Sequence, residues 1–172
     1  MREIELRITR VDALNASLLQ IHPDDSQNVA PLARSVLGAA RPGHSATGGP
    51  RAFSVGPTEW LLIDYSFQDV RRRLSTDLGR ALVRVTDISA AFASLKLEGA
   101  GARAVLASDI GAPWVAHSSQ PGQYARTRLG HVEVVLHCVG DDSFELYVDR
   151  SVADHLEAWL VAQSAEQAFT VQ

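Results

Sequence analysis

Two stretches decide the fold of this chain: LKLEGAGARAVLA at residues 95–107 and DSFELYVDRSVADHLEAWL at residues 142–160. In each, apolar residues first alternate with polar ones, as in a strand, and then recur at helical spacing. Between the two stretches, residues 124–129 and 132–139 have strand patterns, which with residues 144–148 predict a three-stranded meander. The sequence therefore predicts an α+β protein with antiparallel sheets.

The rest of the chain continues the mixture of strands and helices. Alternating charged and apolar residues at the N-terminus predict a strand with one exposed face. The predicted strands before the meander are residues 2–10, 17–21, 52–55, 60–64, 82–86 and 91–98. The predicted helices are residues 29–37, 67–78, 102–108 and 151–160. Ser151 is expected to cap the last helix, with Asp154 in the capping-box position and Trp159 in its buried stripe.

The composition is that of an ordinary globular protein. The 172 residues are 46% hydrophobic and 21% charged, and they suffice for one domain or two small fused halves. The net charge of −4 provides no field that would attract nucleic acid or an anionic membrane. No apolar run is long enough for a membrane span, and the N-terminus has no signal-peptide pattern. The single cysteine, Cys138, excludes an intrachain disulfide and fits the reducing cytoplasm.

Two segments of the chain resemble each other. Residues 54–62 and 138–146 both place a small residue, valine and glycine before an apolar strand, and each is followed by a helix with a serine near its start. This match predicts a single domain over residues 1–172, built from two pseudo-repeated halves of about 1–80 and 81–165. Chance similarity over so few residues is the alternative.

The candidate chemical motifs are incomplete. A dinucleotide-binding loop at Gly99-Ala100-Gly101 would need a third glycine where Ala104 stands, so a tight turn is expected there. His131 and His137 are expected to be exposed strand residues on one face, because a metal site needs three or four convergent ligands. Cys138 has no activating base nearby in sequence and is expected to be a small buried hydrophobe.

Three further features have a plain and a more specific interpretation. The arginines at 71–73 indicate either a solvated helix face or a surface for an acidic partner. Asp141-Asp142 is expected to be a turn pair and no catalytic dyad. Trp114 lies between two predicted elements and is either a core residue or an interface anchor.

The chain resembles the gamma subunit of heterotetrameric sarcosine oxidase. The resemblance covers about residues 50–162 well and the first 45 only loosely. It is carried by GPTEWLL at 56–62, DIS at 87–89, LEGAGAR at 97–103, GQYART at 122–127 and DSFELYVDRS at 142–151. The gamma subunit is similar in turn to the folate-binding part of glycine-cleavage aminomethyltransferases, which implies an interlocked pair of ferredoxin-like units.

The resemblance implies a complex that oxidatively demethylates sarcosine and passes the one-carbon unit to tetrahydrofolate. It places FAD, FMN, NAD and tetrahydrofolate in the alpha and beta subunits and zinc in the delta subunit, with no cofactor, metal or catalytic residue in this chain. The alternatives are a gamma-like subunit of another N-methyl amino acid dehydrogenase and a free-standing folate-binding aminomethyltransferase relative. Because no catalytic motif is found, a role in binding other subunits is expected. The interface candidates are Trp114, Tyr124 and Arg126, in or beside the loop-rich segment 109–126.

Overall fold

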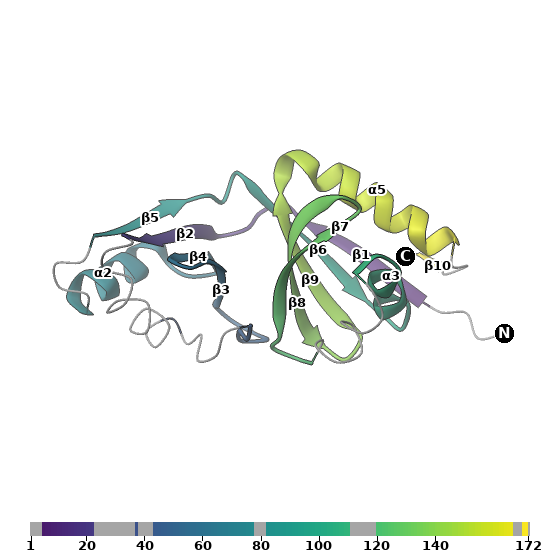
Figure 1. Ribbon diagram of the computed structural model, residues 1–172, viewed down its shortest axis with the longest axis horizontal. Helices are drawn as coiled ribbons and strands as arrows, with labels where there is room; N and C mark the ends of the chain where they lie inside the picture. Colours follow the sequence, from purple (N-terminus) through teal and green to yellow (C-terminus); the bar gives the residue numbers. More distant parts are fainter. Residues whose placement is uncertain are drawn as a thin grey trace. The chain divides into compact units, whose positions relative to one another are not determined.

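The computed structural model describes residues 5–22, 37, 43–77, 82–110, 120–166 and 170–171 (Figure 1). The chain forms two compact units: unit 1 contains Met1–Ala13 and Ala91–Gln172, and unit 2 contains Leu14–Ala90. The chain therefore begins in unit 1, completes unit 2 and returns to unit 1. Among the described helices, none has the length and apolar character needed to cross a membrane.

Unit 1 is a six-stranded sheet with helices on one face. The strand order is β10-β1-β6-β9-β8-β7, antiparallel except for the parallel pair of β1 and β10. Its strands are β1 (Glu5–Val11), β6 (Phe92–Glu98), β7 (Tyr124–Leu129), β8 (Val132–Gly140), β9 (Ser143–Asp149) and β10 (Thr170–Val171). Helices α3 (Gly101–Ile110) and α5 (Arg150–Glu166) pack their buried residues against the sheet. The predicted meander is present as β7, β8 and β9.

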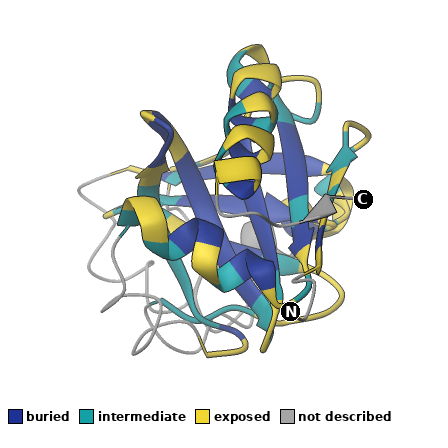
Figure 2. Cartoon of the chain, turned by 90° about the vertical axis from the view of Figure 1, so that its right-hand side faces the viewer, coloured by how far each residue is buried: buried dark blue, intermediate teal, exposed yellow. Residues whose placement is uncertain are grey.

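The core of unit 1 comes from alternate positions along these strands. Phe144, Leu146 and Val148 of β9 are buried and contact Leu156 and Leu160 of α5 within one apolar cluster. Figure 2 shows the same division, with buried residues along the strands and exposed ones along the outer sides of the helices. This face of the sheet follows the period-two pattern of the sequence.

Two details of α5 differ from the prediction. The cap of the helix is Asp149, whose Oδ1 accepts bonds from the Ser151 amide (2.8 Å) and the Ser151 hydroxyl (2.6 Å). Strand β9 runs directly into α5, so Ser151 already lies in the first helical turn. Trp159 is half-buried rather than fully buried, and its indole lies over Gly130, where an added Cβ would come within 2.8 Å of the ring.

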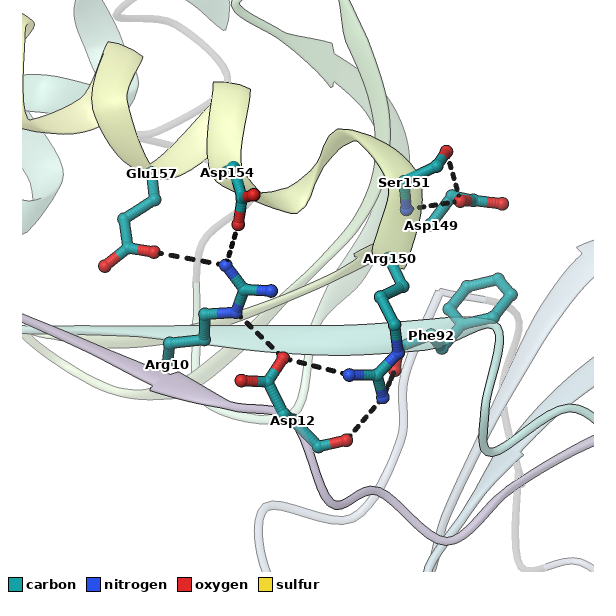
Figure 3. A network of polar contacts seen from close by, with 8 residues as sticks. All are labelled: Arg10, Asp12, Phe92, Asp149, Arg150, Ser151, Asp154 and Glu157. Atoms are coloured by element: carbon teal, nitrogen blue, oxygen red, sulfur yellow. Dashed lines mark hydrogen bonds and ion pairs between the residues drawn. The ribbon is translucent and has the colours of Figure 1, made fainter.

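A polar network joins β1 to the start of α5 (Figure 3). Arg10 pairs with Asp154 and Asp12, and its Nη1 lies 3.6 Å from Oε2 of Glu157. Arg150 Nη1 in turn contacts Asp12 Oδ1 at 3.1 Å. The hydrogen bonds from Asp154 and Asp12 raise the pKa of the Arg10 guanidinium. Asp154 therefore pairs with Arg10 of β1, and within the described residues it does not complete a capping box.

Unit 2 is a four-stranded antiparallel sheet in the order β3-β4-β2-β5. Its elements are β2 (Ala16–Ile21), β3 (Arg51–Gly56), β4 (Glu59–Ile63), α2 (Phe67–Asp77) and β5 (Val83–Asp87). Leu19, Trp60, Leu62 and Val70 form the centre of its core. Ser66 Oγ accepts the Asp69 amide at 3.3 Å and caps α2. The helix predicted at 29–37 lies outside the described residues except for Leu37, which is buried.

Four strands of each unit follow the same order. In the sheets, the run β8-β9-β6-β1 of unit 1 corresponds to β3-β4-β2-β5 of unit 2, but β1 comes first of its four strands in the chain whereas β5 comes last. The strand register shifts between Cys138 and Gly140 in the β8–β9 hairpin and between Ser54 and Gly56 in the β3–β4 hairpin. These two hairpins are the segments whose sequences match, so a duplicated unit would account for both observations. The duplication itself, and the halves at about 1–80 and 81–165, stay a prediction.

Candidate functional site

The face of the six-stranded sheet opposite α3 and α5 holds a group of polar and aromatic side chains. Directly paired residues in a sheet project to the same side, so the strand register defines this group. Its members, called the polar face below, are Ser94 and Lys96 of β6, Tyr124 and Arg126 of β7, His137 of β8, and Glu145 and Tyr147 of β9.

The register arranges the polar face in two rows across the sheet. In one row, Lys96 pairs with Glu145, Glu145 with His137, and His137 with Tyr124. In the other row, Ser94 pairs with Tyr147, Tyr147 with the apolar Val135, and Val135 with Arg126. Four separate strands thus contribute to one face of the sheet, although the residues are far apart in sequence.

The Glu145 carboxylate is the centre of the polar face. The Tyr147 hydroxyl donates a hydrogen bond to its Oε2 at 2.5 Å, and the Lys96 ammonium lies 3.7 Å from its Oε1. The Glu145 side chain is only 6% exposed, whereas the Lys96 side chain is 45% exposed. A buried carboxylate is costly unless it is paired and hydrogen-bonded, and both conditions are met here. These two contacts therefore stabilise the buried carboxylate of Glu145.

Two of the three predicted interface residues lie on the polar face. Tyr124 is half-buried and is directly opposite His137. Arg126 is 56% exposed and its Nη2 lies 2.9 Å from Oε2 of Glu133 on β8. Both belong to β7, an edge strand of the sheet, so they form a rim beside the buried centre. Trp114 lies outside the described residues.

The histidine prediction was wrong in its geometry. His131 is in the turn between β7 and β8, with φ of 67°, and is no strand residue. His137 is a strand residue but fully buried rather than exposed. Cys138 is buried, as expected, and burial raises the pKa of its thiol. Within the described ranges, no three histidine, cysteine or acidic side chains are grouped closely enough to hold a metal ion.

The glycine motif forms the tight turn that its sequence predicts. Gly99 has φ of 108° at the junction of β6 and α3, and its amide donates to the Asp142 carbonyl at 2.9 Å. A Cβ there would lie 2.5 Å from the Glu5 carbonyl oxygen, so the glycine allows close approach of β1. Asp141 and Asp142 are exposed in the turn between β8 and β9, where Arg103 contacts both.

Sequence reasoning missed Glu145 and Tyr147. Their two-residue spacing in β9 was a usable signal, because it puts both on the face opposite Phe144 and Leu146. The network joins a carboxylate, a hydroxyl and an ammonium group, and its carboxylate is held by both of its neighbours. Glu145 and Tyr147 are themselves buried, so the side chains of the polar face that remain accessible are Lys96, Tyr124 and Arg126 at its margins.

Comparison with solved structures defines the class of fold. The structure described as heterotetrameric sarcosine oxidase from Corynebacterium sp. U-96 in complex with pyrrole 2-carboxylate contains a similar chain. The similarity has a TM-score of 0.80 and 22% identity, over 99% of this chain and 89% of that one. Glycine cleavage system aminomethyltransferase T from Bartonella henselae gives a TM-score of 0.64 and 15% identity. That match covers 98% of this chain but 48% of the transferase chain, so the present chain spans about half its length.

These similarities confirm the predicted α+β fold of the aminomethyltransferase type, with two antiparallel sheets. A family model for the sarcosine oxidase gamma subunit matches residues 42–166. The chain belongs to the sarcosine oxidase gamma subunit family. A comparison with curated proteins found no significant match.

Proposed function

We propose that this chain is the non-catalytic gamma subunit of a heterotetrameric sarcosine-oxidase-like complex. The observation that carries the proposal is the family match over residues 42–166. The complex would oxidatively demethylate sarcosine and pass the one-carbon unit to tetrahydrofolate. The fold supports the same role, because the chain is similar over 99% of its length to a chain of a heterotetrameric sarcosine oxidase.

The division of labour in the proposed complex follows from the family. Alpha and beta subunits would hold FAD, FMN, NAD and tetrahydrofolate, and a small delta subunit would hold zinc. The gamma chain would bind and orient these partners in the cytoplasm. The accessible margin of the polar face, with Tyr124 and Arg126, carries the residue types enriched at protein interfaces.

The proposed contact region is the β7 rim of the polar face together with Trp114. Tyrosine, tryptophan and arginine are enriched at interface cores, and permanent interfaces usually bury more than about 2,000 Å². Tyr124 and Arg126 lie next to each other on one face of an edge strand. An edge strand is open to contact along its side, so a partner could cover both residues together.

Co-expression of this chain with the flavin-binding alpha and beta chains and the zinc-binding delta chain tests the proposal. The intact complex should co-purify and oxidise sarcosine, and mass analysis should find this chain in it. Changing Trp114 and Tyr124 together to alanine should weaken assembly while the chain alone still folds. Val161→Ala, at an apolar position on α5 that is 42% exposed, is the control and should assemble normally.

Three results would contradict the proposal. One is normal assembly of the Trp114/Tyr124 double variant, which would remove the proposed contact region. Another is turnover of a folate or methylamine substrate by this chain alone, which would favour a free-standing aminomethyltransferase relative. The third is a complex that oxidises another N-methyl amino acid and leaves sarcosine unchanged.

A further inference from the structure

Unit 2 contains a cleft that the proposed subunit role does not use. It has a volume of about 440 Å³, which is within the usual range for small-molecule sites. The cleft lies where β2 ends and β4 and β5 begin. Its lining residues are Gln20, Ile21, His22, Thr58, Glu59, Leu82, Val83 and Arg84.

Opposite charges flank the cleft on one face of the sheet. Gln20 of β2 pairs with Glu59 of β4 on one side and with Arg84 of β5 on the other. The three side chains therefore project to the same side, with the carboxylate and the guanidinium two strands apart, which is about 10 Å between backbones. Gln20 lies between the two charged residues, so a small molecule that contacts both charges would lie across the Gln20 side chain.

The two charged groups differ in how they are engaged. Gln20 Nε2 donates to Glu59 Oε1 at 2.8 Å, which fixes the carboxylate, and no hydrogen bond or ion pair within the described residues engages its second oxygen. Within the described residues, the Arg84 guanidinium makes no hydrogen bond or ion pair. A guanidinium presents its donors in a planar fork that matches a carboxylate. The cleft thus offers a fixed acceptor and an available carboxylate-binding group.

We propose that this cleft binds a zwitterionic α-amino acid with an apolar side chain. The ligand carboxylate would bind Arg84, and its ammonium group would bind Glu59. The 68%-exposed Leu82, which also lines the cleft, provides apolar surface for the side chain. A ligand with only a negative charge would be repelled by Glu59, and one with only a positive charge by Arg84, so the site selects for both charges. The proposal is independent of the subunit role.

Binding of L-leucine to the full chain, measured by calorimetry and thermal shift, tests the proposal. Leucine should bind at millimolar concentration and raise the melting temperature. N-acetyl-leucine lacks the positive charge and leucinamide lacks the negative one, so both should bind at least about tenfold more weakly. These analogues probe the unaltered protein, and a folding defect cannot explain the result. Absence of leucine binding, or equal binding of either analogue, would overturn the proposal.

Variants locate the site. Arg84→Gln and Glu59→Gln should each weaken leucine binding about tenfold or more. Arg71→Gln, at an exposed arginine of α2 outside the cleft lining, is the matched control and should leave binding unchanged. Leucine binding that survives the loss of either cleft charge would place the ligand elsewhere and refute the assignment. Subunit assembly is measured separately, so the two proposals fail by different results.

Discussion

Replacing Gly99 with alanine should destabilise unit 1 strongly. Gly99 has φ of 108°, a conformation that residues with a side chain rarely adopt. The new Cβ would also lie 2.5 Å from the Glu5 carbonyl oxygen. That oxygen belongs to the backbone of β1, which is paired on both sides, with β6 and β10. The strand cannot move aside without breaking sheet hydrogen bonds.

The magnitude follows from two separate costs. Holding alanine in a sparsely populated backbone conformation costs about 1–3 kcal/mol. Forcing an extra methyl group into a packed site costs about 1–3 kcal/mol. Together they predict a loss of about 2–6 kcal/mol in the free energy of unfolding. For a chain of this length, the melting temperature should fall by roughly 5–20 °C.

Two control variants separate the costs. Gly49 has φ of 68° but no atom within 4 Å of an added Cβ, so Gly49→Ala carries only the conformational cost. Gly48→Ala carries neither the conformational nor the steric cost, so its free energy of unfolding should be close to that of the wild type. Urea unfolding gives the free energies, and hydrogen exchange of the β1 amides shows whether the loss is in unit 1. A Gly99→Ala variant no less stable than Gly49→Ala would refute the steric argument.

Three further outcomes are expected. Asp149→Ala should cost about 1 kcal/mol by removing the α5 cap, whereas Asp149→Asn should keep the cap at neutral pH. The Ser151 hydroxyl and amide lower the pKa of Asp149. The wild type should therefore lose the stabilisation from this cap as the pH falls below about 4, whereas the asparagine variant should keep it. Unfolding measured across an acid titration of both proteins would show the difference. Cys138 should react with iodoacetamide only after denaturant is added, and rapid labelling of the folded chain would contradict its burial. Trp159→Ala should cost about 2 kcal/mol in urea unfolding, less than a fully buried tryptophan, and a loss above about 4 would contradict its half-exposure.

The sequence predicted the strands of this protein because one face of each sheet is largely apolar. Leu95 and Leu97 of β6 are two positions apart, as are Leu146 and Val148 of β9. All four are buried, as the period-two pattern of a strand predicts. The cap of α5 was less predictable, since Asp149 and Ser151 are both good capping residues. The capping residue is the one that stands where β9 ends and α5 begins. The end of β9 depends on the pairing of Asp149 with Phe92 of β6, which the local sequence does not contain.

The polar face could not be predicted in the same way. Period-two reasoning assigns the residues between apolar ones to solvent, so His137 was expected to be exposed. Burial of both faces of a strand depends on the packing of distant segments, which local pattern does not contain. The alternation in β9 did place Glu145 and Tyr147 together, but their bond and the approach of Lys96 required the register of three strands.

The course of the chain has a consequence for the order in which the protein folds during synthesis. Strand β1 leaves the ribosome first, but its partners β6 and β10 are made only after all of unit 2. The sheet of unit 2 can close as soon as Ala90 has emerged, because its four strands lie within Leu14–Ala90. Unit 2 should therefore form first, while β1 waits with both edges unpaired. Slow translation between residues 14 and 91 would prolong that exposure and favour pairing of β1 with other nascent chains.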